Sequence, residues 1–295
     1  YNYLSQAWQK KNNWDEAFAA GWQAVEQSGG EEAQQINFGY LLYESTLEKQ
    51  DSLLREYALK WLEKYPDNQV AQHMGNAVLN RAVRPRANDE YLKNIFDIFA
   101  PDFEQVLTGL DYRAPELIRC LLEEIYGSKK SPRLRILDAG CGTGFCGGFL
   151  KKYSSFRGLY GVDISEKMLE QAQAKKVYSH LLQSELEQYF SQAKTKFDLI
   201  VSADVFTYFG SLEKLLSGMA DSLSAGGRVI FTVSENNLND DDYFLHSSGR
   251  YLHHQNYVRK VLEKVGFEVE KLERAKLRNE GENIVYGYVV SALKK

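Results

Sequence analysis

The sequence has 295 residues, of which 44% are hydrophobic and 26% charged, a composition typical of a globular protein with one large or two ordinary domains. A formal net charge of −4 argues against a dedicated nucleic-acid binder, and no apolar run reaches the ~20 residues of a membrane helix. Three cysteines without framework spacing indicate a reduced, intracellular protein. We therefore expect a cytoplasmic protein without a nucleic-acid, membrane or metal partner.

Residues 1–85 contain no strand-like alternation and read as short helices, with apolar residues at helical spacing in 7–27 and 51–79. NNWDEA predicts a turn into a helix, and YPDN predicts a helix stop followed by a turn. The pattern resembles tetratricopeptide repeats, although the 37-residue offset from Ala17 to Leu54 exceeds their period of about 34. The residues that carry the resemblance are Trp8, Trp14, Ala17, Gly39, Ala58, Pro66 and Gly75.

Residues 86–128 are predicted to form a linker and lid helices. The stretch 83–90, with Pro85 and clustered charge, marks the linker. Pro101 and Pro115 each suit the first turn of a helix, so two or three helices are expected before residue 128.

Residues 129–295 change in character, because strand-like runs now alternate with helical stretches. Such alternation predicts a parallel sheet with helices on both faces. The expected strands lie within 134–140, 158–165, 179–185, 197–203, 227–235, 267–278 and 283–294.

The run ILDAGCGTG, residues 136–144, follows the first strand of this region. Ligands of such sheets bind at the carboxyl ends of the strands, and a glycine backbone can approach a ligand closely. Asp163 ends the second strand, 23 residues after Gly140, where a carboxylate can accept two ribose hydroxyl groups. A nicotinamide enzyme and an enzyme with a nucleoside methyl donor fit these features alike. The two cysteines near the loop, Cys141 and Cys146, have no His or Cys partner nearby in sequence and suit small buried positions.

Three further features distinguish a nicotinamide enzyme from an enzyme with a nucleoside methyl donor. The loop is GxGxG, preceded two residues earlier by Asp138, and not the GxGxxG of the dinucleotide fingerprint. SADVFTYF, residues 202–209, closes the fourth strand with an acid and aromatic residues where a substrate would lie. Two strands joined by a short turn near Gly281 predict an antiparallel terminal hairpin, which is unusual in a simple dinucleotide fold.

Together these features resemble class I S-adenosylmethionine-dependent methyltransferases, over roughly residues 90–295. The whole chain is similar to the bacterial subgroup that carries an N-terminal tetratricopeptide region. The stretches that carry this resemblance lie in 91–118, 136–144, 203–210 and 249–267. The resemblance implies a Rossmann-like, seven-stranded α/β sheet with an antiparallel terminal hairpin, preceded by an all-α helical-repeat domain, and S-adenosyl-L-methionine as cofactor.

The resemblance also implies a set of cofactor-binding residues. Asp138 and the backbone of the loop, with Cys141, would hold the methionine end of the cofactor, and Asp163 its ribose. Ile164 and Met168 would lie against the adenine, and Glu185 with the backbone of Leu186 would face its amino group. The remaining members of the set are Gly140, Gly142 and Gly144 in the loop, and Ala203 and Asp204 at the end of the fourth strand.

Candidates for the acceptor side come from residues expected to face it. Methyl transfer from a sulfonium needs alignment above all, and a general base only if the acceptor must lose a proton. His253 or His254 could be such a base, and Tyr208 or Tyr257 could orient the acceptor. A carboxylate acceptor would need no base and would be anchored by an arginine. The anchoring candidates are Arg113 and Arg250, and Tyr112 pairs with Arg113 in the expected lid.

Three functions remain open on the sequence. The first is methylation of an O or N acceptor on a peptide, protein or carrier-bound substrate that the helical repeats help recruit, because stacked hairpins commonly hold a peptide. The second is a small-molecule methyltransferase whose N-terminal helices are only structural or dimerising. The third is an inactive binding scaffold, disfavoured by the intact Asp138, glycines and Asp163.

Overall fold

The computed structural model describes residues 1–48, 51–81, 84–127, 133–281 and 283–295. Its contacts group into two compact units, Tyr1–Ile98 with Leu245–Arg250, and Phe99–Phe244 with Tyr251–Lys295. The chain therefore changes unit three times. The domain boundaries expected at residues 85 and 128 stay predictions: residue 128 lies outside the described residues, as does residue 83 of the expected linker, and residues 86–98 group with the first unit.

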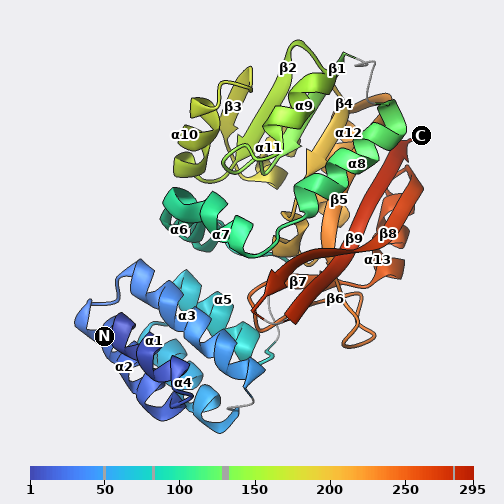
Figure 1. Ribbon diagram of the computed structural model, residues 1–295. Helices are drawn as coiled ribbons and strands as arrows, with labels where there is room; N and C mark the ends of the chain where they lie inside the picture. Colours follow the sequence, from blue (N-terminus) through green and yellow to red (C-terminus); the bar gives the residue numbers. More distant parts are fainter. Residues whose placement is uncertain (49–50, 82–83, 128–132, 282) are drawn as a thin grey trace. The chain divides into compact units, whose positions relative to one another are not determined.

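The first unit is helical, and two of its helices begin where the sequence predicts turns. Asn13 caps one helix by accepting from the amide of Glu16, and Asn68 caps another by accepting from the amide of Ala71 at 2.9 Å. Such asparagine caps satisfy amides that have no partner inside the helix. The helices are α1 (Asn2–Lys10), α2 (Trp14–Gln27), α3 (Glu32–Leu47), α4 (Asp51–Lys64), α5 (Gln69–Val78) and α6 (Asp89–Phe99), the last ending one residue past the unit (Figure 1).

Aromatic rings fill the core of this unit. Phe38 packs edge-on against Trp22 and Trp61, with ring centroids 5.5 and 5.3 Å apart. Gly21 brings α2 close to α3, because a Cβ at this position would lie 2.7 Å from Leu41 Cδ2. Neighbouring helices thus pack closely against one another; their arrangement as tetratricopeptide repeats stays a prediction.

The segment Leu245–Arg250 belongs to the helical unit although the flanking residues do not. The Nε2 atom of His73 lies 2.8 Å from the carbonyl oxygen of Gly249, and the hydroxyl groups of Thr46 and Ser247 are 3.3 Å apart. Gly249 has a φ of +77°, and a Cβ there would lie 2.5 Å from Met74 Sδ. A short strand at Tyr243–Leu245 leads into this segment and shares Leu245 with it.

The second unit contains the sheet and the helices around it. Its helices are η1 (Ala100–Asp102), α7 (Phe103–Gly109), α8 (Ala114–Tyr126), α9 (Gly147–Tyr153), α10 (Glu166–Ala174), α11 (Leu186–Gln192), η2 (Phe206–Tyr208), α12 (Glu213–Ser222) and α13 (Gln255–Lys264). Its strands are β1 (Leu134–Ala139), β2 (Ser154–Asp163), β3 (His180–Gln183), β4 (Phe197–Ser202), β5 (Leu223–Glu235), β6 (Tyr243–Leu245), β7 (Tyr251–His253), β8 (Phe267–Glu280) and β9 (Asn283–Lys294).

The sheet has the order β3-β2-β1-β4-β5-β7-β6, with β9 also paired to β5 and β8 to β9. Strands β1 to β5 pair in parallel, whereas β8 and β9 form the expected antiparallel hairpin. All seven predicted strands are present, but the predicted number is too low, since the described residues form nine strands. The two additional strands, β6 and β7, have three residues each, too few to show an alternating pattern in sequence.

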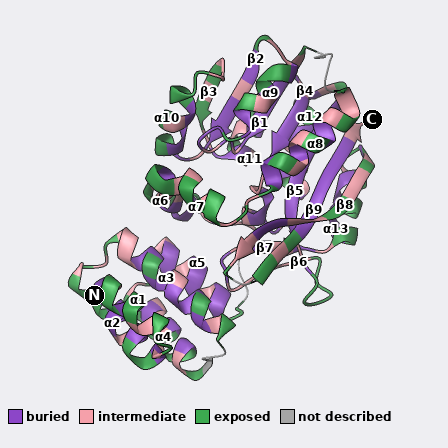
Figure 2. Cartoon of the chain, in the orientation of Figure 1, coloured by how far each residue is buried: buried purple, intermediate pink, exposed green. Residues whose placement is uncertain are grey.

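Helices cover both faces of the sheet. Ile136 of β1 packs in one core with residues of α8 and α9, such as Ile118 and Leu150. Leu137, the next residue, packs in the other core with residues of α11, α12 and α13, because successive side chains of a strand point to opposite faces. The central strands β1, β4 and β5 are largely buried (Figure 2). Because β1, β2 and β4 run parallel, their carboxyl ends lie at the same edge of the sheet.

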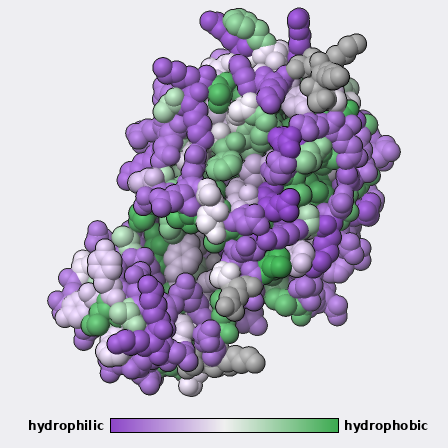
Figure 3. All heavy atoms as spheres, viewed as in Figure 1, coloured by the Kyte–Doolittle hydropathy of each residue, from purple (hydrophilic) through white to green (hydrophobic). Residues whose placement is uncertain are grey.

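Exposed apolar side chains are scattered along the chain, among them Tyr3, Phe156 and Leu238. The face drawn in Figure 3 is mostly hydrophilic, with smaller apolar areas between the polar side chains. No helix within the described residues is both long and apolar enough to span a bilayer.

Candidate functional site

The glycine loop follows β1 and turns over the end of β2. Gly140, Gly142 and Gly144 have φ angles of +76°, +52° and +83°, a region that residues with a Cβ rarely adopt. The amide groups of Gly140 and Cys141 both donate to the carbonyl oxygen of Val162 in β2, at 2.8 and 3.0 Å. The loop is therefore fixed to the neighbouring strand.

The three glycines meet different surroundings. A Cβ at Gly140 would lie 2.4 Å from Val205 Cγ2, and one at Gly144 would lie 2.9 Å from the ring of Tyr178. At Gly142 the nearest atom is Phe103 Cε1, 3.7 Å away. Gly140 and Gly144 are thus required by packing, whereas the middle of the loop leaves room for a ligand to approach the backbone.

Asp163 ends β2 and is 8% exposed. Its Oδ2 accepts from the amide of Gly142 at 2.8 Å and its Oδ1 from the amide of Ser165 at 2.9 Å. These bonds orient the carboxylate beside the loop, as the sequence spacing predicts. A carboxylate held at the end of β2 has the chemistry to accept ribose hydroxyl groups.

Asp138 lies at the end of β1 and is 1% exposed. Its Oδ2 accepts from the hydroxyl group of Tyr178 at 2.6 Å. Burial raises the pKa of Asp138 to about 7, the hydrogen bond from Tyr178 opposes that rise, and the charge of Asp163 adds to it. An ammonium group is the kind of ligand that stabilises such a buried carboxylate.

The residues expected at the adenine lie around the N-termini of α10 and α11. Ser165 caps α10 by accepting from the amide of Met168 at 3.1 Å, and Met168 is fully buried, whereas Ile164 is half-buried. Glu185 caps α11: its two carboxylate oxygens accept from the amides of Glu187 and Gln188 at 2.9 and 2.8 Å, while the next residue, Leu186, is buried. Glu185 therefore has a structural role, and its contact with an adenine stays a prediction.

Ala203 and Asp204 follow β4, next to Val205 under the glycine loop. The amide of Asp204 donates to Thr232 Oγ1 at 2.9 Å. Arg278, which the sequence analysis missed, donates from Nη1 to both carboxylate oxygens of Asp204, at 3.1 and 3.0 Å. Nothing in the sequence of β8 distinguishes Arg278 from the other cationic residues of this strand, such as Arg274. The structure also has a β-bulge between Lys276 and Arg278, which shifts the register there.

The expected lid pair, Tyr112 and Arg113, lies between α7 and α8. The Tyr112 hydroxyl group is 3.5 Å from the carbonyl oxygen of Ala203, and its ring packs edge-on against Phe145 at 6.2 Å. Burial first, and then the charge of Asp204, raises the pKa of Tyr112 well above its usual range. Arg113 is exposed, and its amide donates to the carbonyl oxygen of Leu277 at 2.8 Å.

Helix α7 contacts the loop through Glu104, another residue that the sequence analysis did not identify. Glu104 accepts from Thr143 Oγ1 at 2.7 Å and forms an ion pair with Lys175 after α10. Burial opposes ionisation of Glu104, but its bonds to Lys175 and Thr143 lower its pKa overall. The structure thus brings α7 against the glycine loop.

The two candidate histidines have structural partners. His253 is fully buried, with Nε2 2.8 Å from the carbonyl oxygen of Phe209; a carbonyl requires Nε2 to carry the proton. Burial lowers the pKa of His253 to about 4. His254 caps α13, its Nδ1 accepting from the amide of Asn256 at 3.2 Å. His253 therefore lies in the core, whereas a role of His254 as a general base stays a prediction.

The remaining acceptor-side candidates lie in different parts of the structure. Tyr257 is 4% exposed, and its hydroxyl group accepts from the amide of Leu212 and donates to Glu213, at 2.9 and 3.0 Å, so it is a core residue. Tyr208 lies in η2 and is half-buried. Arg250 belongs to the helical unit, not to the unit of the glycine loop.

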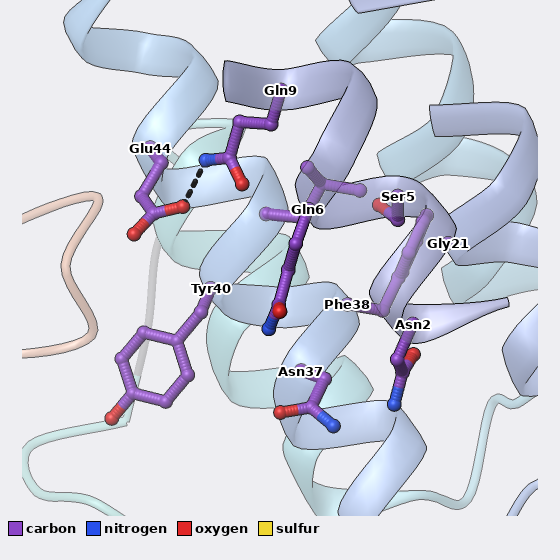
Figure 4. Close-up of a pocket in the computed structure, with 10 residues that line it drawn as sticks. Asn2, Ser5, Gln6, Gln9, Gly21, Asn37, Phe38, Tyr40 and Glu44 are labelled. Atoms are coloured by element: carbon purple, nitrogen blue, oxygen red, sulfur yellow. Dashed lines mark hydrogen bonds between the residues drawn. The ribbon is translucent and has the colours of Figure 1, made fainter. Parts of the chain in front are cut away.

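A second candidate site lies in the helical unit. A cavity of about 110 Å³ opens between α1, α2 and α3. Figure 4 shows the polar side chains of Gln6, Asn37 and Tyr40 around it, and Gln9 forms a hydrogen bond with Glu44 at one side. Its lining consists of Asn2, Ser5, Gln6, Gln9, Gly21, Asn37, Phe38, Tyr40, Leu41 and Glu44.

Comparisons with known proteins place residues 137–231 in the methyltransferase domain family. Human methyltransferase-like protein 27 is 43% identical over 89 residues, which cover 30% of this chain and 35% of that protein. The malonyl-[acyl-carrier protein] O-methyltransferase of Priestia megaterium is 26% identical over 151 residues, covering 50% of this chain and 53% of the enzyme. The chain thus spans between about a third and a half of the length of these curated relatives.

Among solved structures, magnesium protoporphyrin IX methyltransferase from Synechocystis with bound S-adenosylmethionine aligns with a TM-score of 0.48 at 21% identity. The alignment covers 61% of this chain and 79% of that chain. The family match covers β1, the glycine loop, Asp163 and β4. Residues 137–231 therefore match the methyltransferase domain family.

Proposed function

We propose that the protein transfers a methyl group from S-adenosylmethionine to an O or N acceptor on a peptide, protein or carrier-bound substrate, which the tetratricopeptide-like helices help recruit. The observation that carries the proposal is the clamp between Asp163 and the amide of Gly142, which fixes the loop and a ribose-binding carboxylate together. S-adenosylmethionine, when bound, supplies an electrophilic methyl group on a sulfonium.

The residues at the ends of β1 and β2 fit the two polar ends of this cofactor. The open backbone at Gly142 and the buried carboxyl group of Asp138 suit the amino-acid end. Asp163 suits the ribose, and the buried Met168 with Ile164 would border the adenine. Because Glu185 already caps α11, the backbone of Leu186 is the better candidate to bond the adenine edge.

The acceptor would lie beside Ala203 and Asp204. The lid pair Tyr112 and Arg113 and the nearby Tyr208 are the residues proposed to orient it, with methyl transfer depending on alignment and exclusion of water. We assign no base, because His253 and His254 have structural partners. A carboxylate acceptor would not need one.

Two observations support a carrier-bound or peptide substrate. The relative from Priestia megaterium acts on malonyl groups attached to an acyl-carrier protein, as its name states. In this chain, the cavity of the helical unit is lined by the carboxamides of Asn2, Gln6, Gln9 and Asn37, which can both donate to and accept from a peptide backbone.

The test of the cofactor is calorimetric titration of the full chain with S-adenosylhomocysteine, beside an Asp163→Ala variant and with NAD as the control ligand. We expect micromolar binding to the full chain, loss of about tenfold or more in affinity in the variant, as for a charged hydrogen-bonding group, and no heat with NAD. Absence of binding to the full chain would contradict the proposed function.

The test of recruitment uses point variants of the cavity. Deleting residues 1–85 would also remove the partners of Leu245–Arg250, so the deletion would mix two effects. Asn37→Ala with Gln6→Ala should lower transfer to a carrier-bound or peptide acceptor while leaving S-adenosylhomocysteine affinity unchanged. Equal transfer in the variant would favour a small-molecule acceptor instead.

A further inference from the structure

We propose that Tyr178 is a positioning residue for the cofactor: its hydroxyl group holds Asp138 in the orientation and the ionised form that bind the ammonium group at the methionine end. This inference rests on the proposed function, since it concerns the same cofactor site. Tyr178 lies between α10 and β3, more than thirty residues from the glycine loop in sequence.

The ring of Tyr178 fits against three glycines. A Cβ at Gly144, Gly147 or Gly161 would lie 2.9, 2.8 or 3.1 Å from this ring. The first two glycines belong to the loop and the start of α9, and the third belongs to β2. The ring is therefore enclosed by the same elements that form the cofactor site, and its hydroxyl group reaches Asp138 Oδ2 at 2.6 Å.

The surroundings of Asp138 explain why the hydrogen bond from Tyr178 affects the ionisation of this carboxyl group. The titratable groups that interact with Asp138 are Tyr178, Asp163, Cys141 and Cys146. None of these four is a cation, so burial disfavours the carboxylate form. Burial raises the pKa of Asp138 to about 7, and the bond from Tyr178 limits that rise. The pKa of Tyr178 itself is raised far above its usual range, chiefly by burial and then by Asp138, so this hydroxyl group remains a donor.

The consequence is that binding of the ligand is coupled to loss of a proton from Asp138. An ammonium group binds the carboxylate form of Asp138, so binding near neutral pH releases a proton from this group. With a pKa near 7, affinity for a ligand that carries the ammonium should be about tenfold lower at pH 6 than at pH 8. Replacing the hydroxyl group would move this profile to higher pH.

The experiment measures the affinity of the full chain for S-adenosylhomocysteine between pH 6 and pH 8.5, with Tyr178→Phe, which keeps the ring and removes the donor. Losing one hydrogen bond to a charged group raises the pKa by roughly one unit. We therefore expect about a fivefold loss of affinity at pH 7 and less than about a twofold loss at pH 8.5.

Three comparisons show whether the effect of Tyr178→Phe on affinity acts through Asp138. 5′-Methylthioadenosine lacks the amino-acid end, so its affinity should be the same in both proteins and independent of pH. Tyr153→Phe changes another buried tyrosine of this unit, in α9, and should leave the profile of S-adenosylhomocysteine unchanged. Asp138→Asn should bind this ligand more weakly and without the pH dependence.

Other results would overturn the inference. An equal loss of affinity at every pH, an equal loss for 5′-methylthioadenosine, or no loss at all would each show that the hydroxyl group does not act through Asp138. If Tyr178→Phe does not fold, a flat affinity profile of the unmodified chain between pH 6 and pH 8.5 would also overturn it. Failure of the unmodified chain to bind S-adenosylhomocysteine at any pH would instead reject the proposed function.

Discussion

Arg278 and Asp204 form an ion pair that joins the terminal hairpin to the end of β4, with Nη1 of Arg278 within hydrogen-bond distance of both carboxylate oxygens. The side chain of Arg278 is 2% exposed, and it also contacts Glu280 at 2.9 Å. Asp204 has a φ of +57°, an uncommon conformation for a residue other than glycine. The pair therefore holds a strained residue next to Val205, which packs under Gly140.

Replacing Arg278 should be strongly destabilising. Arg278→Met leaves the carboxylates of Asp204 and Glu280 without this guanidinium, and removing one partner of a buried pair costs about 3 kcal/mol or more. We expect a clear fall in the melting temperature, measured by calorimetry. Lys271→Met on the same strand is the matched control: its partners Glu124 and Glu273 have side chains that are 63% and 60% exposed, so its loss should cost at most about 1 kcal/mol. Equal effects of the two variants would contradict the assignment.

Gly140→Ala should disrupt the cofactor loop. The new Cβ would clash with Val205 at 2.4 Å in a residue with a φ of +76°, and strain of this kind costs of order 1–3 kcal/mol before the clash is counted. We expect at least about tenfold weaker binding of S-adenosylhomocysteine in titration calorimetry. Gly148→Ala in α9 is the control, because its Cβ would have no atom within 4 Å. The control should bind normally and gain up to about 1 kcal/mol of stability.

Acid should destabilise the second unit through His253. The pKa of this fully buried ring is lowered from 6.5 to about 4, so the unfolded chain takes up a proton first as the pH falls. The stability contributed by the neutral ring is complete above pH 6.5 and is lost between about pH 6.5 and pH 4, in total about 3 kcal/mol. Urea unfolding at a series of pH values measures this loss.

His253→Gln keeps a side-chain donor for the carbonyl oxygen of Phe209 but does not titrate. Its stability should therefore depend less steeply on pH over the same range than that of the unmodified chain. An identical slope in both proteins would show that other groups cause the acid sensitivity. Urea unfolding at the same pH values should also detect a loss of stability that comes from His73 of the helical unit. Burial lowers the pKa of this ring to about 4 as well.

Gly249→Ala should release the segment Leu245–Arg250 from the helical unit. A Cβ there would lie 2.5 Å from Met74 Sδ and 3.0 Å from the Tyr91 hydroxyl group, in a residue with a φ of +77°. Hydrogen exchange of residues 245–250 should accelerate, because their contacts with the helices are lost. Gly29→Ala is a useful comparison: its φ of +68° carries backbone strain without any atom near the added Cβ, and exchange at 245–250 should not change.

The local patterns of the sequence were sufficient for the elements and for the cofactor loop. Alternation of apolar residues predicts all seven strands of four or more residues, and the terminal hairpin follows from two such runs around Gly281. Gly140, Gly142, Gly144 and Asp163 could be found because their spacing along the chain reflects one turn between adjacent parallel strands. Strands of three residues, such as β6 and β7, carry no pattern of this kind.

The roles of side chains that meet partners distant in sequence were decided only by the tertiary structure. His253 and Tyr257 read as candidates for chemistry, but burial and backbone partners make them core residues. Tyr178 and Arg278 have no motif, because their contacts with Asp138 and Asp204 join segments that are far apart in the chain. A glycine pattern records the backbone conformation of its own loop, whereas the ionisation and orientation of Asp138 depend on which groups the fold packs around it. The sequence by itself therefore determined the seven longer strands and the glycine loop, and the packing of the fold determined which side chains hold that loop in place.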